Sequence, residues 1–593
     1  MAFLQSSFTA LATNPPHRTP PNSKPFSATN PRHRPPPNSK PFSAKLSHFS
    51  AHANRTPRFQ VSCNNGGENQ KPSSEGGRRN MLLGLGGLYG ASNLISEPQA
   101  HAAPIKPPEF KACGEAREVA TGDLLDVNCC PPVSDNIDYK LPQFDKLRVR
   151  PAAHKVTSEY LAKFEEGIRR MKKLDKDDPM DPRGFTQQAN IHCAYCNGAY
   201  DQVGRKDLDL QVHNSWLFFP FHRWYLYFYE RIIGKLIDDP TFVLPFWNWD
   251  NPKGMQMPRI FDNTRSPLYD ENRNQAHRPP AIIDLGFSGA TEDLQIVVNN
   301  LTAMYSEMIR SVNSTTDFMG MPYRDGSSPN PGMGTSERGS HVAVHAWVGD
   351  PRNKYKEDMG SFYSAGRDVL FYSHHANVDR MWSIWRGLKT DVPKEINDPD
   401  YLNAAFLFYD ENKQLVRVKA GDCLDYKKMG YEFEKVDTPW LNYKPSKKAR
   451  KAKIKKITSG AETAEKLFPL TLKKVTRVLL KKSAKGNADE VLVLENIETD
   501  TSKFIKFDVF VNDEDDEAKE LDKAEYAGTF AQLPHKTKDK KGRSTINLRL
   551  TEVYEDIDVD GDDTIVVTLI PRSNGQDVTI GGIKVIPSPP RSG

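Results

Sequence analysis

The first 67 residues of this 593-residue chain contain no aspartate or glutamate, although serine, threonine, proline and basic residues abound there. That composition is typical of an organelle transit peptide and not of a folded domain. The segment repeats the sequence Pro-Pro-Asn-Ser-Lys-Pro-Phe-Ser-Ala at 20–28 and at 36–44, and two copies are too few for a repeat protein. We therefore leave this segment out of the predicted fold.

The chain also lacks an apolar run of the roughly 20 residues that a membrane-spanning helix needs. The apolar run at 81–89 is short and rich in glycine; it follows Arg78-Arg79 and precedes the small-x-small sequence at 100–102. This order indicates a second transfer signal with a cleavage site. The alternative, a short buried helix, would need a folded unit around it, and none is visible. We expect 1–102 to be a chloroplast transit and thylakoid transfer peptide that directs the protein to the thylakoid lumen.

Neither sign of charge dominates, since 81 basic and 76 acidic residues leave a net charge of +5. Composition therefore gives no reason to expect a nucleic-acid partner, and we expect no stable membrane insertion. The chain has only seven cysteines, but five of them lie between positions 113 and 196. Such clustering indicates disulfides or a metal site.

The length of the chain predicts two folded domains plus tails. Apolar residues at helical spacing predict a helix over 158–173, and further helices are expected at 222–237, 291–308 and 377–386, so 103–443 is predicted to be mainly α. The segment 444–466 begins with a lysine-rich, poorly hydrophobic run and is predicted to be an exposed linker. From 467 to 593, alternating β-branched and apolar residues predict an all-β sandwich or barrel.

Most histidines outside the targeting region fall into two sets: His192, His213 and His222, and then His341, His345 and the pair His374-His375. On a helix, the four-residue spacing of the second set would let two rings share a metal. Imidazole-only sites suit copper, zinc, iron or nickel, and copper stands at the top of the affinity series. A lone histidine is more often a surface or hydrogen-bonded residue, but six in two aromatic-rich blocks favour metal binding.

The two blocks resemble the copper-binding motifs of the tyrosinase and catechol oxidase family of type-3 copper proteins, in its plant polyphenol oxidase branch. The resemblance extends to Cys-Cys-Pro-Pro at 129–132, Thr-Pro-Trp-Leu at 438–441 and Lys-Phe-Asp-Val at 506–509, with Pro439 at the position of the family's aspartate. It implies a four-helix-bundle dicopper core with long loops, followed by a C-terminal β domain that shields the active site.

By this resemblance, each of two copper ions is held by three neutral histidines, while His374 is not a ligand. The implied ligands are His192, His213 and His222 for the first copper, and His341, His345 and His375 for the second. The Cys193-x-x-Cys196 pair alone could indicate a zinc or redox site. The resemblance instead implies a Cys196–His213 thioether, disulfides Cys129–Cys193 and Cys113–Cys130, and a free Cys423.

The resemblance also gives three residues roles toward the substrate. Phe362 is expected to be a gate residue stacked above the second copper, although ordinary core packing is the alternative, and Phe371 is expected to brace ligand rings. Glu337 is expected to hold a water and to help take the phenolic proton, although alone it would be a solvated loop charge. Val342 occupies a position where strong monophenol hydroxylases often have asparagine, which favours diphenol oxidation.

These features together predict an enzyme that oxidises o-diphenols to o-quinones and reduces O2 to water at a dinuclear copper site. It is expected to be latent until the C-terminal domain is removed or displaced, with a protease acting near 444–456. Monophenol hydroxylation beside this activity is left open by the sequence. The alternatives are a dedicated biosynthetic oxidase of one specialised phenolic and, less favoured, an oxygen-binding protein. No chemistry is expected from the C-terminal domain, where His535 is the only histidine.

Overall fold

A computed structural model describes residues 103–117, 123–125, 127–445, 458, 460–483, 489–513, 519–536, 538, 541–559 and 562–588. The predicted targeting peptide at 1–102 and most of the predicted linker at 444–466 lie outside the described residues. Within the described ranges, no helix has both the length and the apolar character needed to cross a bilayer.

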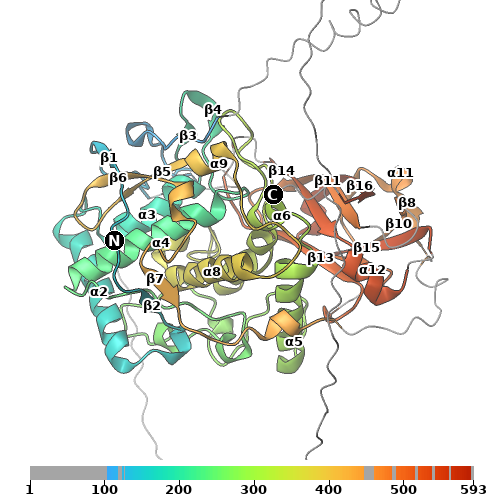
Figure 1. The fold of residues 1–593 in the computed structure, drawn as a ribbon, viewed down its shortest axis with the longest axis horizontal. Helices are drawn as coiled ribbons and strands as arrows, with labels where there is room; N and C mark the ends of the chain where they lie inside the picture. The colour runs from blue at the N-terminus through green and yellow to red at the C-terminus, as the bar shows by residue number, and fades with distance from the viewer. Residues whose placement is uncertain are drawn as a thin grey trace, which may run out of the picture. The chain divides into compact units, whose positions relative to one another are not determined.

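Four long helices form the core of the first part of the chain (Figure 1): α2 packs against α3 and α4, and α4 packs against α8. The α-helices among the described residues before 446 are α2 (Ser158–Asp177), α3 (Phe185–Cys196), α4 (Phe218–Leu236), α5 (Asp293–Tyr305), α6 (Thr315–Met319), α7 (Val342–Val348), α8 (Leu370–Gly387) and α9 (Pro399–Asn403). Two single π-helical turns, η6 (Ser306–Arg310) and η7 (Glu337–His341), continue α5 and precede α7.

Helix α2 shows how the sequence specifies these elements. Thr157 caps its first turn by accepting a hydrogen bond from the Tyr160 amide, which satisfies a donor that the helix itself leaves unpaired. Phe164, Ile168 and Met171 recur on one face and are fully buried, because that spacing places them on one stripe.

Helix α8 begins at Leu370, seven residues before the helix expected at 377–386. The sequence predicts too short a helix because nearly every residue of the first turns is buried. These turns therefore have no polar face that would produce an amphipathic period. His374 and His375 therefore lie inside the helix instead of preceding it. Helix α4 likewise starts at Phe218, and Pro220 is tolerated because its missing N–H falls in the first turn.

Short strands tie the loops around the helices: β1 (Asn136–Asp138), β2 (Arg148–Arg150), β3 (Asp201–Gln202), β4 (Arg205–Asp209), β5 (Ala405–Tyr409), β6 (Leu415–Lys419) and β7 (Tyr431–Phe433). They form three small sheets, in the orders β1-β6-β5, β2-β7 and β3-β4. The β3–β4 hairpin follows α3 directly, so it lies close to the end of that helix.

The C-terminal part, orange to red in Figure 1, is a β-sandwich. One sheet has the order β13-β12-β15-β10-β8 and the other β14-β11-β16-β9. Its strands and helices are β8 (Glu462–Thr463), α11 (Ala464–Leu467), β9 (Leu470–Thr471), β10 (Thr476–Lys481), β11 (Glu490–Asp500), β12 (Ile505–Val511), β13 (Tyr526–Gln532), β14 (Lys541–Arg549), α12 (Thr551–Ile557), β15 (Thr564–Ser573) and β16 (Val578–Pro587).

The sandwich is bonded to the helical part through buried contacts. Ser311 Oγ donates to the Ala527 carbonyl at 2.7 Å, and Tyr305 Oη donates to Glu552 Oε1 at 2.8 Å. Met333, from the helical part, packs into the apolar core of the sandwich, while Leu533 packs into the helical core. The described residues of the two parts therefore share a continuous interface.

Candidate metal centre

The two histidine sets converge in the middle of the helical core. α3 carries His192, α4 carries His222, and a loop between β4 and α4 carries His213. η7 and α7 carry the first two histidines of the second set, and α8 carries the adjacent pair. All seven side chains are at most 2% exposed, so their arrangement is fixed by packing.

The rings of the two sets face one another at short distances. The rings of His222 and His375 stack with centroids 4.1 Å apart, and those of His213 and His341 lie 5.7 Å apart. Nε2 of His345 lies 3.3 Å from Nε2 of His375. Within the second set, one ring nitrogen of each of the four histidines lies within 4.8 Å of the others. The same holds for one ligand atom each of His192, Cys196 and His213.

Backbone carbonyls orient four of these rings through Nδ1. His192 Nδ1–H donates to the Phe362 carbonyl at 2.7 Å, and His345 Nδ1–H donates to the Met359 carbonyl at 2.8 Å. His222 and His341 bond in the same way to the carbonyls of Phe218 and Glu337. A neutral imidazole that donates from Nδ1 keeps its lone pair on Nε2, and such outer contacts fix the orientation of metal ligands.

Three of these four Nε2 lone pairs meet no hydrogen-bond donor from the described residues. Nε2 of His192, His222 and His341 is buried without a hydrogen-bond partner among the described residues. An unpaired buried nitrogen is costly, whereas a bound metal ion would satisfy it. The donor set contains only imidazoles and no carboxylate, which suits copper and disfavours magnesium or calcium. The residues therefore fit the two copper ions expected from the sequence.

Burial keeps these rings neutral. It lowers the pKa of His222 to about 3 and that of His345 to about 4, and it lowers the pKa of the other ring nitrogens well below the usual value. The charged form of an imidazole loses its hydration in such a site. Neutral rings are the form that binds a metal cation.

His213 differs from the other rings, because neither of its ring nitrogens has a hydrogen-bond partner among the described residues. The buried thiol of Cys196 belongs to the same close group. Cys129–Cys193 and Cys113–Cys130 are disulfides in the structure; the first attaches the N-terminal loop to α3, and the second joins two positions within that loop. Cys423 is a buried free thiol.

His374 lies within the second group but has a different hydrogen bond. Trp249 Nε1 donates to His374 Nδ1 at 3.1 Å, so the neutral ring must carry its proton on Nε2. That tautomer offers no lone pair toward the other rings. This tautomer favours a structural role for His374 over a role as a metal ligand. Its ring stacks on that of His341 with centroids 5.5 Å apart.

Phe362 lies elsewhere than expected. Its ring stacks on His213 with centroids 4.2 Å apart and meets His192 edge-on, so it lies over the first set and not over the second. The difference arises because the Phe362 carbonyl is itself bonded to His192, which draws this loop toward α3. Phe371 lies 4.2 Å from His375 and 4.9 Å from His192, between the two sets.

Glu337 is a buried carboxyl at the edge of the site, only 1% exposed. Its Oε1 accepts a hydrogen bond from the Asn214 amide at 2.7 Å, and its Oε2 has no partner among the described residues. Burial raises the pKa of Glu337 to about 8, because the charged form is poorly solvated there. Val342 is buried at the start of α7, directly after His341.

The C-terminal domain places one further residue beside the site, which the sequence does not single out. The ring of His535 lies 5.8 Å from that of Phe362, on a segment that follows β13. It is 3% exposed; its Nδ1–H donates to the Leu533 carbonyl, and its Nε2 has no partner in the described chain. The sequence offers one signal for this position, since His535 is the only histidine between 467 and 593.

Family models match three consecutive parts of the chain: the common central domain of tyrosinase at 182–388, the polyphenol oxidase middle domain at 395–446, and the chloroplastic polyphenol oxidase C-terminal domain at 468–587. Catechol oxidase B, chloroplastic, of Solanum tuberosum is 49% identical over 564 residues, which cover 91% of this chain and 94% of that protein. The chain belongs to the plant polyphenol oxidase family.

Two solved structures of latent enzymes resemble the whole described fold. Latent apple tyrosinase is 46% identical with a TM-score of 0.72, covering 77% of this chain and all of that one. Latent aurone synthase is 42% identical with a TM-score of 0.76, covering 82% of this chain and all of that one. Family membership confirms the predicted fold class, the dinuclear copper cofactor and the oxidase class, and it makes the enzyme a chloroplast protein.

Proposed function

We propose that the enzyme oxidises o-diphenols to o-quinones, with two diphenols consumed for each O2 reduced to two waters. The observation that carries this proposal is the convergence of six neutral, buried histidines beside a buried carboxyl, one oxygen of which accepts no hydrogen bond from the described residues. When bound, the copper pair supplies electron transfer from the diphenol to O2. We assign the first copper to His192, His213 and His222, and the second to His341, His345 and His375.

The protein's own residues bind and deprotonate the substrate in this proposal. Glu337 accepts a phenolic proton, directly or through a water, at its unpaired Oε2. Two nearby cations would stabilise its carboxylate and lower its raised pKa toward the working range. Phe362 supports an aromatic substrate by stacking, and the apolar side chain of Val342 offers no hydrogen bond to orient a water for monophenol hydroxylation.

We attribute latency to the segment that carries His535. His535 N–H donates to the Thr501 carbonyl at 2.8 Å, and Lys538 N–H donates to Asp209 Oδ2 at 2.9 Å. Lys538 Nζ also pairs with Asp201 at 2.6 Å. These contacts hold His535 over Phe362 from both sides. We propose that a protease frees the site by cutting near 444–456 and that the enzyme works in the thylakoid lumen.

Metal analysis of single variants tests the ligand assignment. His375→Ala and His341→Ala should each bind one copper per chain after loading and dialysis, and His374→Ala should bind two. If His375→Ala retains two coppers, the assignment of the second site is wrong.

A second candidate function is the dedicated oxidation of one specialised phenolic. The 42% identity to latent aurone synthase, over the full length of that chain, favours this function. The same six histidines would serve both functions. Initial rates with 4-methylcatechol, tyramine and a chalcone separate them. We expect 4-methylcatechol to be oxidised fastest; a chalcone preference above tenfold would favour the dedicated function.

A further inference from the structure

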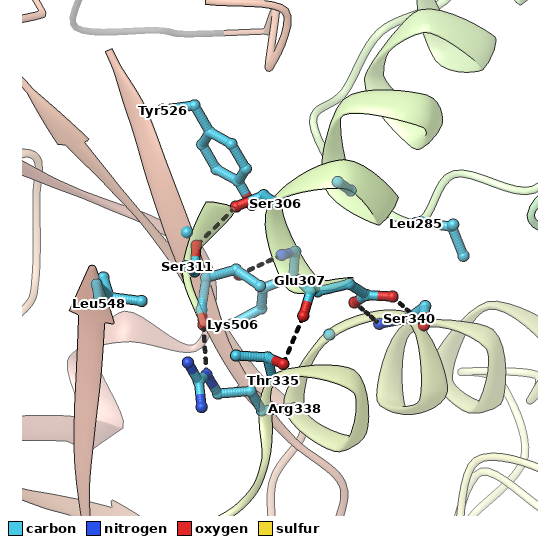
Figure 2. A pocket seen from close by; sticks show the side chains of 14 residues that line it. Leu285, Ser306, Glu307, Ser311, Thr335, Arg338, Ser340, Lys506, Tyr526 and Leu548 are labelled. Atoms are coloured by element: carbon cyan, nitrogen blue, oxygen red, sulfur yellow. Dashed lines mark hydrogen bonds between the residues drawn. The ribbon is translucent and has the colours of Figure 1, made fainter. Parts of the chain in front are cut away.

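A small cavity of about 20 Å³ lies between the catalytic region and the C-terminal sandwich. Its lining comes from η6 and η7 on one side and from β12, β13 and β14 on the other (Figure 2). The cavity has room for about one water, so it is too small for a ligand. The carboxyl group of Glu307 lies at the wall of this cavity.

Glu307 is bonded to a single residue through both of its carboxyl oxygens. Its Oε2 accepts from the Ser340 amide at 2.8 Å, and its Oε1 accepts from Ser340 Oγ at 2.6 Å (Figure 2). Glu307 is 6% exposed. Two buried hydrogen bonds to one residue are expensive to remove, because the Ser340 amide would be left unpaired.

The turn that Glu307 holds is irregular. η7 is a single π-helical turn, and Gly339 inside it has φ −97° and ψ −113°, far from helical values. A side chain at position 339 would collide with the Glu307 carboxyl. Single π-turns of this kind are frequent at functional sites. The carboxyl therefore packs directly on the distorted residue and fixes the amide that follows it.

Both ends of this turn carry residues of the proposed site. Glu337 begins the turn and His341 ends it, and His341 Nδ1–H bonds back to the Glu337 carbonyl at 3.3 Å. A shift of the turn would change the position of the proton acceptor relative to the ligand ring. Ser340 is the residue directly before that ring, so its two bonds to Glu307 set the entry to α7.

The C-terminal sandwich contacts the same turn. Arg338 Nε donates to the Thr529 carbonyl at 3.2 Å, and the guanidinium also reaches the Asn547 carbonyl. Lys506 lines the same cavity, and its charge opposes the rise in the pKa of Glu307 that burial causes. The turn is therefore held by Glu307 from the catalytic side and by the shielding domain from the other.

We propose that Glu307 is a positioning residue for the second copper site, acting through Ser340 on His341 and Glu337. The proposal rests on the assignment of His341 as a ligand in the proposed function. Glu307 touches neither substrate nor ligand nitrogen; it holds the π-turn in the one arrangement that points His341 inward. Outer contacts of this kind are worth about 10- to 100-fold in metal affinity.

Glu307→Leu, Glu307→Gln and the matched control Asp317→Leu test the proposal in the full chain. Asp317 is also a buried carboxyl that accepts a serine amide, from Ser314, but α6 carries no site residue. We would measure copper release to a chelator, the EPR signal of the loaded cupric enzyme, and the melting temperature.

We expect Glu307→Leu to release one copper at least about tenfold faster and to show the EPR signal of an uncoupled cupric ion. Glu307→Gln should behave like the parent, because its amide can still accept from the Ser340 amide and donate to Ser340 Oγ. Asp317→Leu should lower the melting temperature but keep both coppers coupled. Copper release and EPR unchanged in a folded Glu307→Leu would overturn the proposal.

Ser340→Ala keeps the test decisive if Glu307→Leu does not fold, since it removes only the hydroxyl contact. Faster release of one copper would support the proposal, and parental release with a coupled EPR-silent pair would reject it. His341→Ala, measured in parallel, separates a failure of the ligand assignment from a failure of the positioning role. If His341→Ala loses one copper while the Glu307 and Ser340 variants do not, only the positioning role fails.

Discussion

At the scale of the residue, each imidazole of the site has a specific arrangement that prepares it for a metal. Four rings are held by a carbonyl at Nδ1, which directs the lone pair of Nε2 inward. His375 has no partner at Nδ1, and His213 has none at either ring nitrogen, among the described residues. A covalent bond to Cys196 would supply the missing restraint, and this bond is a prediction that the close approach of the two side chains supports.

Cys196→Ser tests this restraint. We expect the variant to fold, because a buried hydroxyl replaces a buried thiol of similar size, but to bind the first copper about tenfold more weakly. Peptide mass spectrometry of the parent should find the Cys196 and His213 peptides joined and lighter by two hydrogen atoms. Separate peptides with a free thiol in the copper-loaded parent would contradict the thioether.

The residues that could be predicted from sequence were those with a distinctive type and spacing, above all the histidines of the two blocks. Glu307 could not be predicted, because it lies 33 positions before Ser340 and its role depends on a π-turn that leaves no period in the sequence. The position of Phe362 was also out of reach, since a backbone hydrogen bond to His192 sets it. Contacts made by backbone atoms have no sequence signature.

At the scale of the element, the described residues 533–536 and 538, which follow β13, contact the catalytic region. The sequence of this segment has no regular pattern, so nothing in the sequence indicates its position beside the histidines. Its ends are held by Leu533, in the helical core, and by Lys538, on the β3–β4 hairpin. Between them the ring of His535 lies 5.8 Å from that of Phe362, so we propose that the segment acts as a strap over this ring.

His535→Ala in the uncleaved enzyme tests the strap. An aromatic contact contributes about 1 kcal/mol, so we expect the latent rate with 4-methylcatechol to rise roughly fivefold. The rate after proteolysis should stay at the parental value, because the strap is then displaced. His535→Phe, which keeps the ring contact, is the matched control and should remain latent. An unchanged latent rate in His535→Ala would show that other contacts shield the site.

The prediction of elements was most accurate where a helix has two faces. Helix α2 was found from its apolar stripe, and the alternating strands of the sandwich were found in the same way. Helix α8 was predicted too short because its first turns are buried on all sides. Hydrophobic periodicity appears where one face of an element is buried and the other faces water, so it cannot mark a helix that is buried on all sides.

At the scale of the whole molecule, the buried histidines make stability depend on pH. The pKa of His222 is lowered to about 3 and that of His345 to about 4, against about 6.5 in the unfolded chain. Because the folded values are lower, these rings stabilise the fold fully above pH 6.5. Their contribution falls by about 1.4 kcal/mol per ring and pH unit as the pH drops toward the folded pKa values.

Glu307 and Glu337 act in the opposite direction, because burial raises the pKa of each to about 8. Their contribution is present below an unfolded pKa of about 4.3 and is lost as the pH rises toward 8. The buried rings outnumber them, so we expect the melting temperature of the metal-free protein to fall steadily from pH 6.5 to pH 4. Copper should be released over the same range. A melting temperature that rises on acidification would contradict neutral, buried ligands.

In the mechanism that we propose, a six-histidine copper pair oxidises diphenols and the C-terminal domain shields it. Oxygen uptake with 4-methylcatechol by the copper-loaded mature protein, before and after limited proteolysis between 444 and 466, tests it most directly. We predict slow uptake before cleavage and fast uptake after it, with two molecules of quinone formed for each O2 consumed. Reversible oxygen binding without quinone, or equal rates before and after cleavage, would contradict the account.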